Sequence, residues 1–230
     1  MFNRNPLNNT SSVVQPQQSQ LVINQVLRNT YILLSLTLLV SAISAFISMH
    51  TNAAPLNIFV MLIVSFGLLF GIMFTRNSPM GIVLTFLFTA FEGWTLGPIL
   101  NFYIREFSNG GQLIMTALGG TGVIFLVLSA IAMNPARDFS RWGRFLMIGL
   151  IVAIVMSLLN MFWLKLPGMQ IAVSIIFTLI FGAFILYDTN RIVRGGQTNY
   201  VMATVSLYLD ILNLFLQLLQ LLAMFSGRRD

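Results

Sequence analysis

Seven apolar stretches, each long enough to cross a bilayer, constrain this chain more than any other feature. A membrane-spanning helix needs about 20 predominantly apolar residues. Only 8% of the 230 residues are charged, against about 25% in a soluble domain. The sequence therefore predicts an all-α integral membrane protein with one domain, residues 21–230, and seven transmembrane helices. They are expected at Asn29–Ser48, Pro55–Thr75, Pro79–Tyr103, Gln112–Met133, Gly143–Trp163, Gly168–Thr189 and Tyr200–Phe225.

The first 20 residues have a different composition. They are rich in Asn, Gln and Ser and contain two prolines. Such a segment cannot bury enough apolar surface to offset the entropy of ordering. We expect residues 1–20 to form a disordered polar tail.

The basic residues predict how the chain is oriented, because Lys and Arg collect in the cytoplasmic loops of membrane proteins. With a cytoplasmic N-terminus, eight basic residues lie inside and four outside, which favours this orientation and an outside C-terminus. The net charge of +6 is thus explained by topology and predicts no nucleic-acid partner. The inside group is Arg4, Arg28, Arg76, Arg137, Arg141, Arg144, Arg191 and Arg194; the outside group is Arg105, Lys165, Arg228 and Arg229.

Polar residues recur along one face of the last predicted helix. Their spacings of 4, 3, 4 and 3 place them in a single stripe. Each group would be costly to leave without a hydrogen bond in lipid, so the stripe faces other helices or a water-filled cavity. It predicts pore-lining side chains, although serines and amides can also simply join helices. The stripe consists of Ser206, Asp210, Asn213, Gln217 and Gln220.

Two aspartates lie within the last two apolar stretches. Asp188 and Asp210 belong to antiparallel neighbouring helices joined by a short loop, so their carboxyl groups can meet if the sixth helix continues past Arg191. Two carboxyl groups in contact in a low-dielectric site share one proton and titrate as a unit, which predicts a pH-sensing pair. The alternative is that each aspartate forms a separate ion pair with Arg76, Arg191 or Arg194.

The third apolar stretch also contains an acidic residue, and the chain lacks the common motifs of enzymes and cofactor sites. Glu92, midway along the third stretch, is a further pore-lining candidate, since ionisable groups inside a membrane are functional by default. The chain has no cysteine and no phosphate-binding glycine loop, dinucleotide fingerprint or HExxH motif. Tyr187-Asp188 resembles the first motif of intramembrane aspartyl proteases, but the region of Asp210 lacks their glycines. We therefore predict neither an enzyme nor a cofactor.

Several motifs together resemble the Bax inhibitor-1 (transmembrane Bax inhibitor motif) family, and most closely its proteobacterial branch, which includes the modulator of the FtsH membrane protease. The resemblance covers nearly all of the chain after residue 20. It is carried by LYDTN at 186–190, SLYLDILNLF at 206–215, VLRNTY at 26–31, LGPILN at 96–101 and ALGGT at 117–121.

The resemblance implies a seven-helix bundle with the last helix in its centre, located in the bacterial inner membrane. It also implies a pH-sensitive calcium leak, gated by a hydrogen-bonded aspartate dyad onto which an arginine at the end of the second helix latches. Asp188 and Asp210 match the dyad, and Arg76 is the candidate latch.

We therefore expect a pH-sensitive calcium leak channel. Ca²⁺ prefers carboxylate and amide oxygens, so a permeating ion would bind transiently at Asp188 and Asp210. The alternative function is a non-transporting membrane regulator that binds and modulates a membrane protease such as FtsH. The polar tail suits such a partner, because disordered segments engage partners readily.

Overall fold

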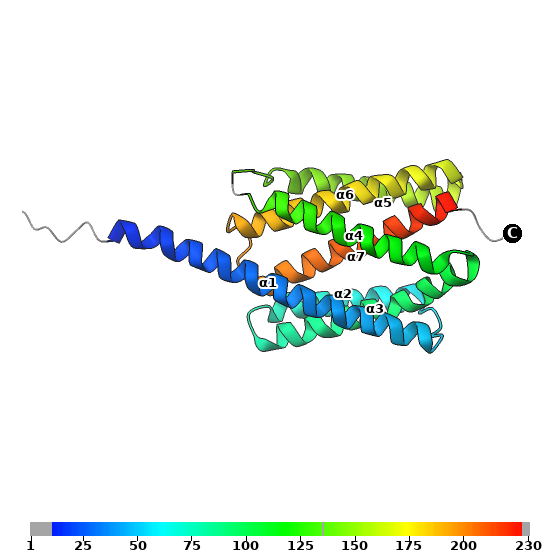
Figure 1. Ribbon diagram of the computed structural model, residues 1–230, viewed down its shortest axis with the longest axis horizontal. Coiled ribbons are helices and arrows are strands. Elements are labelled where there is room, and N and C mark those ends of the chain that lie inside the picture. The colour runs from blue at the N-terminus through cyan, green and yellow to red at the C-terminus, as the bar shows by residue number, and fades with distance from the viewer. Residues whose placement is uncertain (1–10, 135, 227–230) are drawn as a thin grey trace, which may run out of the picture.

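The computed structural model describes residues 11–134 and 136–226, which are helical apart from their short loops (Figure 1). In this part of the chain, seven helices are long and apolar enough to cross a membrane, which confirms the predicted fold class. The helices are α1 Ser11–His50, α2 Ile58–Thr75, α3 Pro79–Glu106, α4 Gly110–Ala132, α5 Trp142–Leu159, α6 Pro167–Val193 and α7 Tyr200–Ser226, and a π-helical turn, η1 Asn160–Leu164, continues α5.

Two helix boundaries bear on the predictions. Helix α6 continues to Val193, so Asp188 lies more than a turn inside the helix, as the pairing of the aspartates requires. Helix α1 begins at Ser11, so the boundary predicted at residue 20 falls inside a helix, and residues 11–20 are its first turns. The rest of the predicted tail, residues 1–10, lies outside the described residues.

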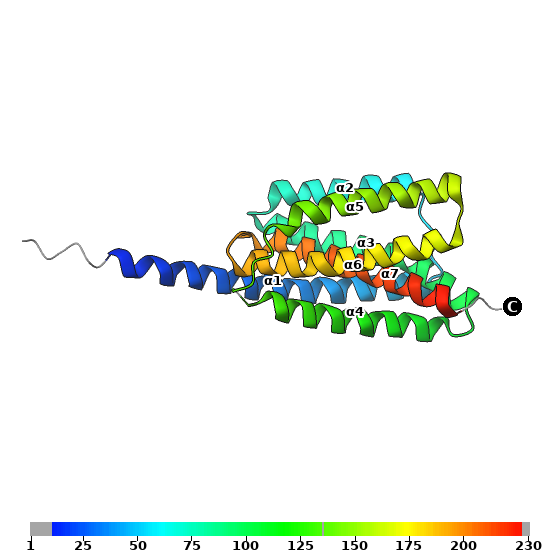
Figure 2. The ribbon, with the colours of Figure 1, turned by 90° about the horizontal axis from the view of Figure 1, so that it is seen from above.

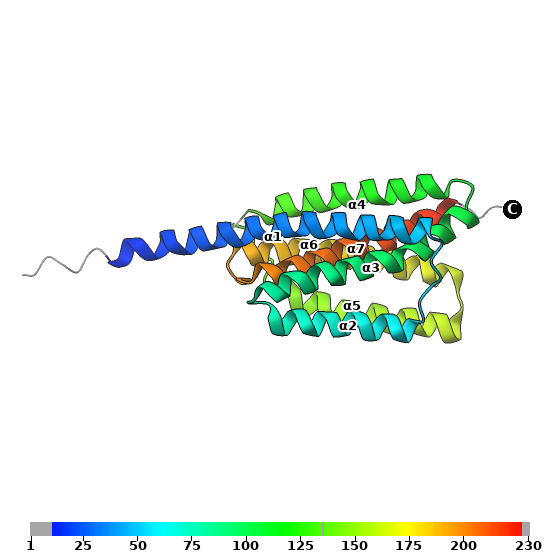
Figure 3. The ribbon, with the colours of Figure 1, turned by 90° about the horizontal axis from the view of Figure 1, so that it is seen from below.

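The helices run roughly parallel to one long axis (Figures 1 and 2). Helix α1 packs closely against α3, which also contacts α2, whereas α6 contacts α4 and α5. The N-terminal part of α1 projects beyond the other helices (Figure 3). We call this side the N-terminal end of the bundle and the opposite side, with the C-terminus and the α5–α6 turn, the far end.

The contact between α1 and α3 depends on two glycines. A β-carbon on Gly93 would lie 2.8 Å from both the backbone C and Cα of Ser41, and one on Gly97 would lie 2.5 Å from Cβ of Ser48. Small residues let membrane helices approach closely. At this separation two α1 hydroxyls donate to α3 carbonyls: Ser44 to Ala90 at 2.6 Å, and Ser48 to Trp94 at 2.8 Å.

Helix α7 contacts α1, α2, α3, α4 and α6, and in Figure 1 it runs between α4 and the pair α1 and α3. Tyr208, Leu207 and Leu214 on this helix are almost completely buried. Helices α2 and α5, by contrast, expose large side chains, with Phe74 81% and Phe145 76% accessible, as expected for surfaces that face lipid. The central position of α7 stays a prediction, which these contacts favour.

Candidate functional site: an aspartate pair in a polar cleft

A cavity of about 510 Å³ lies between α5, α6 and α7, and both intramembrane aspartates line it. Helix α6 contributes Asp188 and an aromatic wall, α7 contributes Asp210 and polar side chains, and α5 contributes two aliphatic ones. The cavity is therefore apolar on two sides and polar along α7. Its other lining residues are Leu150, Ile154, Phe177, Phe181, Phe184, Ser206, Leu209, Asn213 and Gln217.

The carboxyl groups of Asp188 and Asp210 lie within interaction range of each other on the packed helices α6 and α7. Asp210 is 7% exposed, and Asp188 is half-buried. Among the described residues, Oδ2 of Asp210 has no hydrogen-bond donor. Because a carboxylate carries no donor, two carboxyl groups bond to each other only when one of them holds a proton. The structure thus brings together the two residues that the sequence predicts as a dyad.

The predicted alternative was a separate ion pair for each aspartate. Arg191 is the arginine whose charge acts on Asp188, but its Nε donates to the carbonyl of Gly196 at 3.2 Å. The ion pair found in the described part of the chain joins Arg194 Nη2 to Asp138 Oδ2 at 3.2 Å. The geometry favours the shared carboxyl pair over two separate ion pairs.

The α4–α5 loop is fixed to α6 two residues after Asp188. Asn190 is 1% exposed. Its Nδ2 donates to the carbonyls of Ala132 and Arg137 at 3.1 and 3.0 Å, and its Oδ1 accepts from the backbone N–H of Phe139 at 3.2 Å. Movement of this end of α6 is therefore coupled to the loop.

Asp138, in the same loop, is solvent-exposed and lies outside the membrane spans. Hydrogen bonds from Ser140 hold the pKa of its carboxyl below its usual range, and the charge of Arg194 acts in the same direction. Asp138 therefore stays ionised throughout the neutral range.

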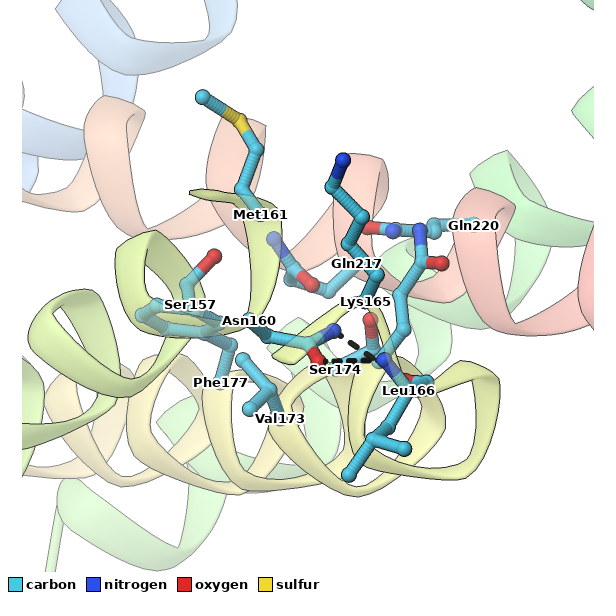
Figure 4. A pocket seen from close by; sticks show the side chains of 11 residues that line it. Ser157, Asn160, Met161, Lys165, Leu166, Val173, Ser174, Phe177, Gln217 and Gln220 are labelled. Carbon is cyan, nitrogen blue, oxygen red and sulfur yellow. Dashed lines mark hydrogen bonds between the residues drawn. The ribbon is translucent and has the colours of Figure 1, made fainter. Parts of the chain in front are cut away.

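The polar stripe of α7 lies along two adjoining cavities. Ser206, Asn213 and Gln217 share the cavity of the aspartates. Gln217 and Gln220 line a second one, of about 520 Å³, between η1, α5, α6 and α7 (Figure 4). The two cavities share Phe177 and Gln217. Together they form what we call the polar cleft, which runs from the aspartates to the far end of the bundle.

The candidate latch, Arg76, follows the last residue of α2 and is exposed. Its carbonyl accepts a hydrogen bond from Nδ2 of Asn199 at 2.9 Å, and Asn199 Oδ1 accepts from the N–H of Met202 in the first turn of α7. The end of α2 is thus tied to the start of α7. Arg76 is not among the charges that act on Asp188, so its latch role stays a prediction.

Glu92 is not among the residues that line the polar cleft. Its Oε1 accepts a hydrogen bond from Ser65 Oγ at 2.6 Å, so it joins α2 to α3 and is half-buried there. Its charge acts on Tyr208, whose hydroxyl forms a 2.8 Å hydrogen bond with Ser41. The structure therefore separates Glu92 from the other pore-lining candidates.

One wall of the cleft consists of residues that the sequence did not predict. Ser157, Asn160, Lys165, Gln170 and Ser174 line its far cavity. No stripe marked these residues, because they come from two helices and the turn between them. The chain's single lysine, Lys165, was a signal in the sequence, but it entered only the count of basic residues expected outside the membrane.

Comparisons with known proteins show the family of this chain. A family model described as inhibitor of apoptosis-promoting Bax1 matches residues 23–227. A membrane protein of Vibrio cholerae is 46% identical over 205 residues, which cover 89% of this chain and 91% of the relative. The modulator of FtsH protease YccA of Escherichia coli K12 is 42% identical over 208 residues, covering 90% and 94%. A protein of Escherichia coli O6:H1, named inner membrane protein YccA, is equally similar. These matches extend over almost all of the bundle, and the chain belongs to the Bax inhibitor-1 family.

Proposed function

We propose that this multi-pass membrane protein is a pH-sensitive calcium leak channel of the bacterial inner membrane, with its N-terminus in the cytoplasm. The observation that carries the proposal is that the carboxyl groups of Asp188 and Asp210 lie together, within interaction range, in the wall of a polar cleft. A structural hydrogen bond would need no ionisable group, whereas an acid pair inside a membrane marks an ion or proton pathway.

The proposed switch is the loss of the shared proton. Without it, two negative charges face each other, and at about 4 Å and an effective dielectric constant of about 20 they repel by about 4 kcal/mol. The repulsion is relieved by a cation or by separation of α6 from α7. Ca²⁺ suits the site, because carboxylate and carboxamide oxygens are its preferred ligands, and Asn213 lines the same cavity. With the proton present, the negative charge falls and the helices stay packed. In its proposed role as a latch, Arg76 would bind the deprotonated, negatively charged aspartate pair.

Calcium uptake into proteoliposomes, measured with an enclosed dye as a function of pH, tests this proposal. The double variant Asp188→Asn, Asp210→Asn keeps two hydrogen-bonding side chains but has no titrating group. We expect it to lose the pH dependence and most of the flux. Asp138→Asn removes an acid outside the membrane and serves as the matched control. Wild-type flux and pH profile in the double variant would refute the gating mechanism.

A second function has its own support. The relative of Escherichia coli K12 is named a modulator of FtsH protease, and the N-terminal part of α1 projects from the bundle, where a partner can contact it (Figure 3). We propose that this chain also binds and modulates such a membrane protease. Deleting residues 1–20 should abolish co-purification with the protease and spare calcium flux. Unchanged co-purification would contradict the role of this segment, and the absence of any stable protease complex with the full chain would contradict the function.

A further inference from the structure

Lys165 lies at the mouth of the polar cleft on the far end of the bundle. It follows the π-helical turn η1 and precedes α6. Its side chain extends over the cavity, on the side of Gln217 and Gln220 (Figure 4). It is the only lysine in the sequence. The cleft thus has a positive charge at one end and the pair Asp188–Asp210 at the other.

The turn that carries Lys165 is held by hydrogen bonds on both sides. Its backbone N–H donates to the carbonyl of Asn160 at 2.8 Å. The Asn160 side chain bonds to the backbone of Leu166 twice. Its Oδ1 accepts from the N–H of Leu166 at 2.9 Å, and its Nδ2 donates to the carbonyl of Leu166 at 3.2 Å. The lysine therefore projects from a fixed backbone.

Backbone preference does not explain a lysine at this position. Its φ of 49° places it in the left-handed region, which favours glycine or asparagine because other side chains crowd the carbonyl oxygen there. No described ion pair uses its ammonium group either, since the salt bridge found in the described residues joins Arg194 and Asp138. Its charge is available to the cleft.

The walls between the two ends are neutral. In the far cavity they consist of hydroxyl and carboxamide groups from Ser157, Asn160, Gln170, Ser174, Gln217 and Gln220, together with apolar side chains. These oxygens are ligands that a hard cation accepts. A cation entering from this end meets the ammonium group before it reaches them.

We propose that Lys165 is a tethered cation that restricts the entry of cations into the polar cleft from the far end, and restricts divalent cations more than monovalent ones. At about 6 Å in a water-like dielectric, Coulomb repulsion lowers the local concentration of a monovalent cation about threefold and of a divalent cation about tenfold. Its effect on calcium flux rests on the leak function proposed above, whereas its effect on access to the cleft does not.

Access is measured by cysteine labelling, because the chain has no cysteine. Ser157→Cys places a nearly isosteric thiol in the cavity wall. The labelling ratio is the reaction rate of this thiol with a cationic methanethiosulfonate divided by its rate with a neutral methanethiosulfonate. Because both reagents react with the thiolate, the ratio does not depend on how much of the thiol is ionised. We expect Lys165→Gln to raise this ratio about threefold and Lys165→Arg to leave it unchanged. In 1 M salt the difference should shrink, since the screening length falls to about 3 Å.

Ala54→Cys is the matched control, because it is exposed in the α1–α2 loop of the same end and lines a different cavity. Its labelling ratio should not respond to Lys165→Gln. An unchanged ratio at Ser157→Cys, or an equal change at both positions, would overturn the proposal.

Ion flux in proteoliposomes gives the second measurement. Lys165→Gln should raise calcium uptake about tenfold and monovalent cation uptake about threefold. If labelling responds as expected while neither wild type nor variant conducts, the leak function fails and the role of Lys165 in access stands. Equal increases for both ions would overturn the divalent preference.

Discussion

Gly93→Ala tests whether the close contact between α1 and α3 holds the bundle together. The added methyl group would lie 2.8 Å from the C and Cα atoms of Ser41 and closer still to its carbonyl oxygen. Real β-carbon contacts are essentially never shorter than 3.0 Å and ordinarily begin at 3.4 Å, so the two helices must move apart by several tenths of an ångström. The obstacle is backbone, which no side-chain rotation removes.

The cost follows from two contributions. Overpacking of a well-packed interface costs about 1–3 kcal/mol. Separation also lengthens the hydrogen bonds from Ser44 to Ala90 and from Ser48 to Trp94, and such bonds in membrane proteins contribute about 0.6 kcal/mol each. We expect Gly93→Ala to lower the free energy of unfolding by about 2–4 kcal/mol.

The assay is reversible unfolding of the purified protein in mixed micelles, followed by helical circular dichroism. Gly119→Ala is the matched control, because a β-carbon there meets no atom within 4 Å, and we expect little change or a small gain. Stability of Gly93→Ala within about 0.5 kcal/mol of wild type would refute the reasoning.

A rescue experiment separates the two glycines of this interface. At Gly97 the nearest obstacle is the Ser48 side chain, so Ser48→Gly should partly restore the stability of Gly97→Ala. At Gly93 the obstacle is the backbone of Ser41, and Ser41→Gly should not restore Gly93→Ala. Rescue at both positions would show that the helices are less constrained than the structure indicates.

Three further predictions address the loops and α7. The pKa of Asp138 is lowered in the folded protein, so its stabilisation is complete above its unfolded pKa and is lost as pH falls through the folded pKa. The stability difference between wild type and Asp138→Asn should therefore be constant from pH 5 to 8. Asn190→Ala removes three hydrogen bonds to the α4–α5 loop and should cost about 2–4 kcal/mol, with faster hydrogen exchange in that loop. Tyr208→Phe leaves the Ser41 hydroxyl without its 2.8 Å partner and should cost about 1 kcal/mol in the same unfolding assay.

The fold was predictable because length and apolarity alone require membrane-spanning helices. The ends of the helices were less predictable than their number. The predicted start of α1 at Asn29 differs from Ser11, since hydropathy locates the apolar span and cannot show how far a helix extends into water. The tight α1–α3 contact was also missed. Gly67 and Gly71, four residues apart on α2, also suggest a packing face by their spacing. A β-carbon on Gly71 would lie 3.2 Å from Cδ1 of Leu84 on α3, whereas one on Gly67 meets nothing within 4 Å.

The site was predictable where one helix carried the pattern. The spacing on α7 placed Ser206, Asn213 and Gln217 beside Asp210, because helical periodicity fixes which residues share a face. The far cavity was not predictable in this way. Asn160 and Lys165 reach it only through a π-helical turn and a left-handed residue, and no periodic pattern encodes that backbone path.

The two faces of α7 differ in how their polar groups are satisfied, and this difference supports a hydrated cleft. On the packed face, the hydroxyl of Tyr208 has a protein partner. On the cleft face, Asp210 Oδ2 and Gln217 Oε1 have no hydrogen-bond donor among the described residues. A buried polar group without a partner costs about 1–3 kcal/mol. Both atoms belong to residues that line cavities of about 500 Å³, which are large enough for water to lie beside their polar groups. Water in these cavities is what the proposed leak function requires as a path for a proton or a cation to the aspartate pair.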